Sequence, residues 1–484
     1  MGWRISSNRG TGSKNQASQE GSVQPSGHDI SMMVLTHLST QDIANLYLVN
    51  SYTRNFVEPV LYSKFSWTWS TEQEQEFRSQ KCEDNSLDGK NSALVLFIRT
   101  LMDRPDLATH VKAITLIDPR PFPRPLRTTS LDVAKASRLM EPCLPRPYEI
   151  ASYRLRWGEL GKLVALLLSQ VRNLRSLELD RIFNHDLAYM GIFCDDFRVL
   201  RENRKPFFPH LKKIMYQSPE SRGAGSNEPS RTRHVIQLPG IETASLTLYF
   251  PHWPLDPLRR DASYFYPCRS SIVELCVENI REKSLPSLLQ NMGLKKLTYG
   301  WTYDPSDLYM DGPGVQRIYL DNIVQALSSS WNTLTHLTIE NRSGPYTLHH
   351  PKFMTLGSLR GLREQTKLQH LELPLHFIAG YQPAERIRIQ EVIPKQVESL
   401  VITDSFWPHP IWDRGNRNRG WGRQEILDLV GSFLKTWMTT NPWLKTLTLS
   451  LDSMQTWANV DWGQLDAWSR MYDLKVITPI RETS

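Results

Sequence analysis

Two kinds of hydrophobic pattern follow one another along this chain. Residues 28–67 hold three short runs in which apolar side chains recur every three or four positions, as expected for one face of a helix. The runs are Ile30, Met33, Val34 and Leu38, then Ile43, Leu46 and Tyr47, then Tyr52, Phe56 and Val57. From about residue 111 onward, short segments alternate apolar and polar residues, which is typical of strands. The patterns predict a three-helix module over residues 28–70 and a different domain behind it.

Small polar residues mark the expected ends of these helices. Ser39 or Thr40 is placed to cap the second helix, and Asn50 or Ser51 to cap the third. Pro59 is expected to end the third helix because proline lacks an amide hydrogen. Helices of about eight residues are not stable alone, so they must pack together or against a partner.

Residues 71–110 are predicted to be a linker that ends in a helix. Ala93–Met102 has a continuous helical pattern, and the Arg104-Pro105 pair interrupts it. Val111–Ile117 then alternates like a strand and opens the long domain that we assign to residues 111–484.

One short phrase returns eleven times in that domain: an apolar residue, two variable residues, an apolar residue, one variable residue and another apolar residue. Its period, about 30 residues, is within the range of solenoid repeats. The predicted central residues are Ile114, Leu177, Ile214, Leu246, Leu275, Leu297, Leu337, Leu371, Leu400, Leu447 and Ile477. Apolar segments that fit returning helices precede several of these strands, over residues 158–170, 284–292, 321–330 and 425–441.

The phrase resembles the strand of leucine-rich repeats, where alternate side chains of a short strand point into a continuous core. Each strand alone buries too little surface, and stacked neighbours close the core. The asparagine of regular repeats is missing, so we expect an α/β fold with an irregular leucine-rich-repeat solenoid of parallel strands and helices. The alternative is a set of unrelated parallel strands in an ordinary α/β domain.

The helical module resembles the F-box found in large fungal protein families. The positions that match are Leu38, Ser39, Asp42, Ile43, Leu46, Leu48, Val49, Asn50, Arg54, Pro59, Leu61 and Tyr62. The join of helix, Arg-Pro-x-Leu and strand around Arg104 also resembles the segment that comes after the F-box in those proteins.

F-boxes dock on the Skp adaptor of cullin–RING ubiquitin ligases, so the resemblance implies a substrate receptor that is not itself an enzyme. By matching position, the residues that would dock on the adaptor are Ile30, Val34, Leu38, Ile43, Leu46 and Val49. The family usually opens with Leu-Pro, whereas Ser26 and Gly27 stand at those two positions here. A second hypothesis is therefore an interaction scaffold whose F-box does not dock.

Four long insertions between repeats are candidates for binding loops: residues 119–127, 218–234, 251–267 and 407–423. The last is rich in tryptophan and arginine, the residue types that contribute most to interface energy. Its candidate substrate-binding residues are Trp407, Trp412, Arg414, Arg417, Arg419, Trp421 and Arg423. The same residues could stack on nucleic acid, which gives a third, weaker hypothesis.

The remaining features restrict the possible functions. Residues 1–27 are polar and contain no long apolar run, so we expect a disordered tail without a signal peptide. The net charge of +7 is spread along the chain, which favours a role in solubility over a nucleic-acid footprint. The five cysteines have no metal-ligand spacing and fit free thiols in a reducing compartment, the cytosol or the nucleus. The absence of nucleotide-binding, hydrolase and zinc motifs predicts a protein without cofactor or metal, and the lack of a long apolar run at the N-terminus leads us to expect no membrane attachment.

Overall fold

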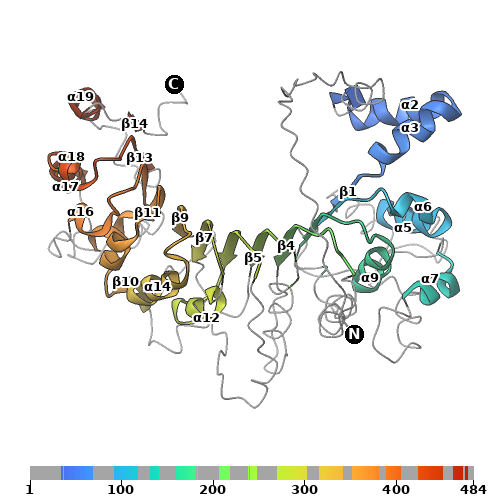
Figure 1. The fold of residues 1–484 in the computed structure, drawn as a ribbon, viewed down its shortest axis with the longest axis horizontal. Coiled ribbons are helices and arrows are strands. Elements are labelled where there is room, and N and C mark those ends of the chain that lie inside the picture. Colours follow the sequence, from blue (N-terminus) through green and yellow to red (C-terminus); the bar gives the residue numbers. More distant parts are fainter. Residues whose placement is uncertain are drawn as a thin grey trace, which may run out of the picture. The chain divides into compact units, whose positions relative to one another are not determined.

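The computed structural model describes 34–35, 37–68, 92–117, 131–140, 160–180, 183, 207–217, 238, 240–247, 270–290, 292–301, 315–341, 352–380, 388–404, 423–450, 462–472 and 475–477. The chain divides into two compact units, Met1–Leu61 and Tyr62–Ser484. Figure 1 shows their secondary structure, coloured along the sequence.

The first unit is helical. Helix α2 (Thr40–Val49) begins at Ser39, whose hydroxyl accepts a hydrogen bond from the Asp42 amide at 3.2 Å. Helix α3 (Ser51–Leu61) follows Asn50, whose side-chain oxygen accepts from the Thr53 amide at 2.8 Å. The predicted caps are therefore confirmed. Of the alternatives Ser39 or Thr40 and Asn50 or Ser51, the capping residues are Ser39 and Asn50.

The prediction that Pro59 ends the third helix is wrong, because α3 continues to Leu61. Pro59 lies in the last turn, so its missing amide hydrogen removes one hydrogen bond near an end that is already open. A small apolar core holds the first unit together. Its buried side chains are Leu35, Ile43 and Val57. Leu38, Leu46, Tyr47, Phe56, Val60 and Leu61 pack against it from partly buried positions.

The second unit is α/β and is built on a parallel sheet of twelve strands. Their order across the sheet follows the order along the chain, β1-β2-β3-β4-β5-β6-β7-β9-β11-β12-β13-β14. The strands are β1 (Lys64–Thr68), β2 (Ala113–Ile117), β3 (Ser176–Leu179), β4 (Lys213–Gln217), β5 (Thr243–Thr247), β6 (Glu274–Glu278), β7 (Lys296–Trp301), β9 (His336–Asn341), β11 (His370–Pro374), β12 (Ser399–Thr403), β13 (Thr446–Ser450) and β14 (Lys475–Ile477).

All eleven predicted phrases lie at strands of this sheet, and nine of the eleven predicted centres stand in one row across it. The strand register pairs Ile114, Leu177, Ile214, Ala244, Leu275, Leu297, Leu337, Leu371, Leu400, Leu447 and Val476 in succession. Most of these side chains are almost completely buried and form one continuous core. The apolar phrase therefore marks the strand positions that face the core.

Two predicted centres are wrong. Leu246 pairs with Tyr216, two residues beyond the row, so Ala244 is the centre of β5 and the strand still buries the same face. Ile477 pairs with Thr448, one residue beyond the row, so Val476 is the centre of β14. A shift of one residue exchanges the two faces of a strand, which makes this second error the larger one.

Three strands of the structure are absent from the sequence prediction. β1 pairs with β2 and places Phe65 beside Ile114, so residues 64–68 belong to the sheet and not to the helical module. β8 (Val315–Tyr319) and β10 (Lys352–Leu356) form a separate parallel pair outside the twelve-stranded sheet. β8 leads directly into a helix, α14 (Leu320–Leu327), and β10 is followed closely by the 3-10 helix η8 (Leu359–Glu364).

Short helices connect the strands. They are α5 (Ala93–Asp103), α6 (Pro105–Ala108), α7 (Val133–Met140), α9 (Leu160–Gln170), η5 (Glu282–Ser284), α12 (Leu285–Leu289), η7 (Ser328–Ser330), α15 (Leu375–Ala379), α16 (Ile389–Val392), α17 (Arg423–Leu434), α18 (Trp437–Thr440) and α19 (Trp462–Tyr472), besides α14 and η8. The four segments predicted to return as helices contain α9, α12, α14 and the pair α17–α18. Figure 1 shows α9, α12 and α14 on the same side of the sheet.

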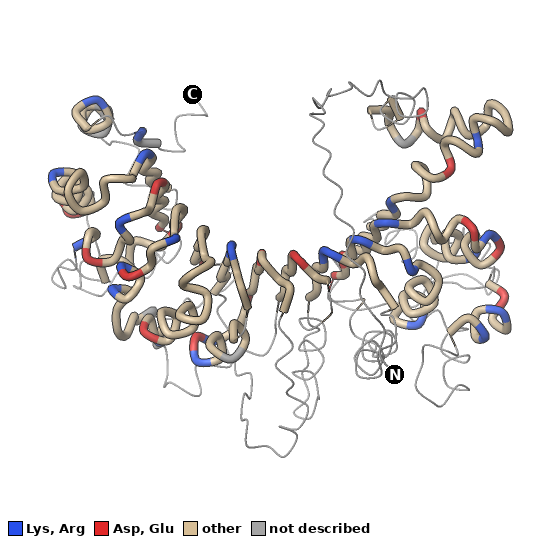
Figure 2. The backbone as a smooth tube through the Cα atoms, viewed as in Figure 1, with Lys and Arg blue, Asp and Glu red and all other residues tan. Residues whose placement is uncertain are grey.

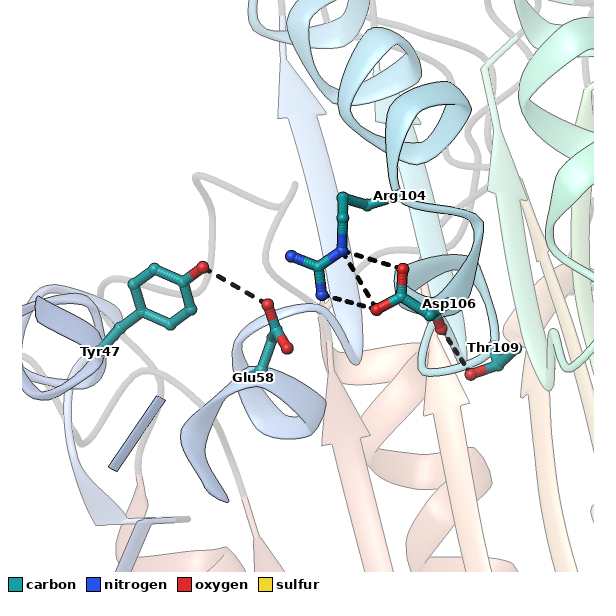
Figure 3. A network of polar contacts seen from close by, with 5 residues as sticks. All are labelled: Tyr47, Glu58, Arg104, Asp106 and Thr109. Carbon is teal, nitrogen blue, oxygen red and sulfur yellow. Dashed lines mark hydrogen bonds and ion pairs between the residues drawn. The ribbon is translucent and has the colours of Figure 1, made fainter. Parts of the chain in front are cut away.

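The Arg104-Pro105 break occurs where it is predicted, between α5 and α6. The Arg104 guanidinium donates a hydrogen bond from Nε to Asp106 Oδ1 at 2.9 Å, and Thr109 Oγ1 donates to the Asp106 carbonyl at 2.6 Å (Figure 3). The neighbouring guanidinium lowers the pKa of the Asp106 carboxyl. These contacts fix the turn that leads the chain into β2.

The first prediction concerns the buried row. Leu337→Ala removes a side chain that is 1% exposed and leaves a cavity, so we expect the free energy of unfolding to fall by about 2–5 kcal/mol. Thr298→Ala on β7, at a half-exposed position, should change it by no more than about 0.5 kcal/mol. Chemical denaturation of both variants measures the difference, and equal losses would contradict the assignment of faces.

The second prediction concerns His376 in α15, which is completely buried. Burial disfavours the imidazolium and lowers the pKa of His376 to about 3, whereas the unfolded chain has the ordinary value near 6.5. As the pH falls below 6.5, the unfolded state binds a proton that the folded state excludes. The stability is therefore full above pH 6.5 and declines as the pH falls toward 3, by about 2 kcal/mol at pH 5.

His376→Gln should remove this part of the decline, which unfolding curves at pH 7.5 and pH 5 measure. His210→Gln, at an exposed histidine before β4, is the matched control and should behave like the unchanged chain. A decline of full size in the His376→Gln variant would rule out this explanation.

Candidate functional site

The structure divides the predicted adaptor-docking residues between the core and the surface of the helical unit. Ile43 is 8% exposed and belongs to the core, and Leu38 and Leu46 pack against that core. Val34 and Val49 are 54% and 64% exposed. Ile30 lies outside the described residues. The predicted set therefore mixes side chains that hold the unit together with side chains that are available to a partner.

A compact group of exposed apolar side chains lies where α2 ends and α3 begins. Leu48 is 74% exposed and Tyr52 is 82% exposed, with Val49 between them in sequence. We call Leu48, Val49 and Tyr52 the junction patch. Leu48 and Tyr52 are missing from the predicted docking set, which follows positions of the F-box match: Leu48 matches the F-box without being assigned to docking, and Tyr52 is not a matching position. Their exposure in the folded unit is the signal that identifies them.

Contacts between the two helices support this junction. The Tyr47 hydroxyl on α2 donates a hydrogen bond to Glu58 Oε1 on α3 at 3.4 Å (Figure 3). The Arg54 guanidinium lies over the Tyr47 ring, 4.9 Å from its centroid. Together with the apolar core, these contacts hold the helix ends from which the junction patch projects.

The predicted substrate-binding residues are not placed by the described part of the chain. Trp407, Trp412, Arg414, Arg417, Arg419 and Trp421 lie outside it. Arg423 is the first residue of α17, and only its backbone is described. Their role stays a prediction, as does the nucleic-acid hypothesis that rests on the same loop.

A second candidate surface is the face of the large sheet opposite the buried row, which we call the open face. Its side chains are half-buried or exposed along most strands, and many are serine or threonine. Five carboxylates lie beyond the first open-face position of their strands: Glu178 and Glu372 at one level of the register, and Asp180, Glu278 and Glu340 two residues nearer the C-terminal ends. We call these five residues the acidic row.

Threonines on neighbouring strands orient three of these carboxylates. Thr115 donates to Glu178 at 3.3 Å, and Thr247 donates to Glu278 at 3.2 Å. Thr338 makes a longer contact with Glu372, at 3.4 Å. The same cross-strand arrangement recurs at three places in the sheet because the parallel register keeps equivalent positions opposite one another.

Glu340 and Glu372 come from adjacent strands and repel each other. Burial raises the pKa of the Glu340 carboxyl, and the nearby charge of Glu372 raises it further. Burial also raises the pKa of Glu372, although the Thr338 hydroxyl opposes this shift. A cation placed over the pair would relieve both the desolvation and the repulsion.

The N-terminal ends of the strands have a different character. Lys213 and Lys296 are exposed there, and the rings of His336 and His370 stack with centroids 4.1 Å apart. Burial and the neighbouring His370 lower the pKa of His336. In Figure 2, lysines and arginines and also acidic residues are distributed over many strands and helices of the unit. The separation of basic residues at the strand beginnings from carboxylates further along the strands is therefore a feature of the open face alone, and not of the whole unit.

Within the residues whose placement is described, no group of three or more histidine, cysteine, aspartate or glutamate side chains could hold a metal ion. Among those same residues no helix has the length and apolar character needed to cross a membrane. No family model matches the chain, and no curated protein matches it in sequence.

The third prediction tests the repulsion within the acidic row. Glu372→Gln removes the charge beside Glu340, so the pKa of Glu340 should fall toward its ordinary value. A carboxyl with a raised folded-state pKa costs stability once the pH exceeds its unfolded value, so this variant should also be more stable at neutral pH. Carboxyl titration by NMR and denaturation measure the two effects. Glu398→Gln, at a glutamate paired with Lys445 at 2.6 Å, is the control and should leave the Glu340 titration unchanged.

Proposed function

We propose that this protein is a substrate receptor of a cullin–RING ubiquitin ligase. In this proposal the helical unit is an F-box that docks on the Skp adaptor. The second unit is an irregular leucine-rich-repeat solenoid that holds a protein substrate. The receptor contributes no catalytic group, because its task is to bring the substrate near a ligase that other subunits form.

The observation that carries the proposal is the junction patch on the helical unit. Leu48, Val49 and Tyr52 expose most of their surface on a unit whose described core has only three buried apolar side chains. Large apolar side chains grouped on so small a unit are characteristic of an interaction surface. An adaptor that covers them would supply the apolar burial that the short helices lack.

The sheet unit supports the other half of the proposal. Successive strands align one apolar side chain each in a continuous row, as stacked repeats require. Such an array leaves its second strand face open over a long distance, which suits recognition of an extended partner. The separate pair β8–β10 and the irregular connections fit the prediction of an uneven solenoid.

The second candidate function is an interaction scaffold without adaptor docking. It is favoured by Ser26 and Gly27, which stand where F-boxes usually have Leu-Pro. Such a scaffold would bind partners stably and would not promote their turnover. The two functions differ in one measurable property, namely association with the adaptor.

The fourth prediction is that the full chain co-purifies with the Skp adaptor and that the junction patch is required. Leu48→Asp and Tyr52→Asp each replace an exposed apolar side chain with a charge, so each should weaken the complex about 30-fold or more. Isothermal titration calorimetry with purified adaptor measures the affinity. Circular dichroism checks that both variants keep their helices.

Asn45→Asp on α2 and Asn55→Asp on α3 are matched controls, because they add the same charge at exposed polar positions. Both should bind the adaptor within about twofold of the unchanged chain. Ile43→Asp places a charge in the core of the helical unit and should reduce its helix content. Failure of the unchanged chain to bind any adaptor would favour the scaffold, and full binding by Leu48→Asp and Tyr52→Asp would remove the junction patch from the interface.

A further inference from the structure

The open face of the large sheet divides its charges between the two ends of its strands. At the first open-face position of each strand the charged residues are Lys64, Lys213, Glu274, Lys296 and Lys475, besides the pair His336 and His370. At the following open-face positions of the described strands the charged residues are those of the acidic row, without a lysine or arginine. The face is therefore cationic where strands begin and anionic where they end.

The carbonyl groups of the strands add to this division. Parallel strands all end at the same edge, so the last carbonyl oxygens lie on the side of the acidic row. The carboxylates are also half-buried and not fully solvated, and threonine hydroxyls hold three of them in place. A half-buried, oriented carboxylate interacts more strongly with a cation than a freely moving surface carboxylate does.

From this arrangement we propose that the C-terminal half of the open face binds an extended polypeptide segment that carries arginine or lysine side chains. The inference rests on the proposed function, because it names the chemistry of the substrate that the receptor would hold. It places substrate recognition on the strands themselves, in addition to the Trp/Arg insertion.

The spacing of the acidic row indicates how the basic side chains are distributed. Neighbouring strands lie about 4.8 Å apart, so Asp180 directly after β3 and Glu278 on β6, which share one level of the register, are separated by about 14 Å across three steps. Two further steps, about 10 Å, lead from Glu278 to Glu340 on β9. An extended chain advances about 3.3 Å per residue, so a peptide that crosses the strands would present cations about four and then three residues apart.

A nucleic acid is the less suitable occupant. Its phosphates would meet the carboxylates of the acidic row at β3, β6, β9 and β11, and like charges that face each other across an interface reduce affinity. Two further lysines that directly precede strands are already paired with glutamates, Lys212 with Glu242 and Lys445 with Glu398, each at 2.6 Å, so they add little positive charge for a phosphate. The charge pattern thus favours a basic polypeptide.

The fifth prediction uses a fluorescent twelve-residue peptide of glycine and serine with arginine at positions 2, 6 and 9, titrated with the full chain in the absence of adaptor. We expect saturable binding that weakens with salt and is absent for the peptide with glutamate at the same positions. A peptide with three consecutive arginines should bind more weakly, because it cannot reach carboxylates on separate strands. Fluorescence anisotropy gives the affinities.

Two triple variants distinguish the effect of the acidic row on peptide binding from the effect of net charge. Glu278→Gln, Glu340→Gln and Glu372→Gln together should weaken binding about tenfold or more. Glu242→Gln, Glu274→Gln and Glu398→Gln change the net charge by the same amount at the other strand ends and should bind within about twofold of the unchanged chain. Thermal unfolding verifies that both fold, and single Glu278→Gln and Glu340→Gln variants provide the same comparison if the triple variant does not.

Equal loss of binding in the two triple variants would overturn the proposal, since it would show a response to net charge alone. Absence of binding to the arginine peptide, or tighter binding to a twelve-residue oligothymidine, would overturn it as well. Adaptor affinity of the same triple variants should equal that of the unchanged chain. Failure of adaptor docking therefore disproves the receptor function without affecting the peptide result, and failure of peptide binding leaves the docking result intact.

Discussion

The alignment of one buried apolar residue per strand is the constraint on which the large unit depends. Parallel pairing with constant register places Leu275, Leu297, Leu337 and Leu371 side by side, so each strand covers part of its neighbour's core residue. A five-residue strand has too little apolar surface to be stable alone. Because side chains alternate, the same register also fixes which residues lie on the opposite face. The open face and its charges are thus a direct consequence of how the core is built.

The return of the apolar phrase predicted the parallel α/β architecture because strand alternation is a local property of the sequence. It located ten of the eleven phrases on the correct face, and it failed at β14, where the last phrase has a different spacing and two consecutive apolar residues, Val476 and Ile477, fit the pattern equally well. At β5 the central residue is Ala244, whose small side chain is a weaker apolar signal than Leu246. Only its pairing with Ile214 and Leu275 identifies it as the centre. Strands β1, β8 and β10 are missing from the prediction, although Tyr62, Phe65 and Trp67 at β1 and Val315, Ile318 and Leu320 at β8 have the spacing of the phrase.

The candidate surfaces depend on the folded structure more than the core does, for a physical reason. Ile43 and Leu46, which the F-box match assigns to docking, also lie on the helical stripe that faces the core of the helical unit. The apolar side chains that stay exposed, Leu48, Val49 and Tyr52, are identified only once the two helices are packed. The acidic row is similarly invisible in the sequence, because Glu178, Glu278 and Glu340 are far apart along the chain and come together only through the register.

The open face carries carboxylates that stability alone does not favour. For folding alone, glutamine or threonine at residues 340 and 372 would be preferable, because two half-buried carboxylates repel each other and lose hydration. The buried row can tolerate this cost because its apolar contacts extend over the whole sheet and do not involve the open face. Each repeat can therefore carry whatever polar side chain a partner requires without losing its place in the core. A sheet of this construction separates the residues that determine the fold from those that determine its binding partners.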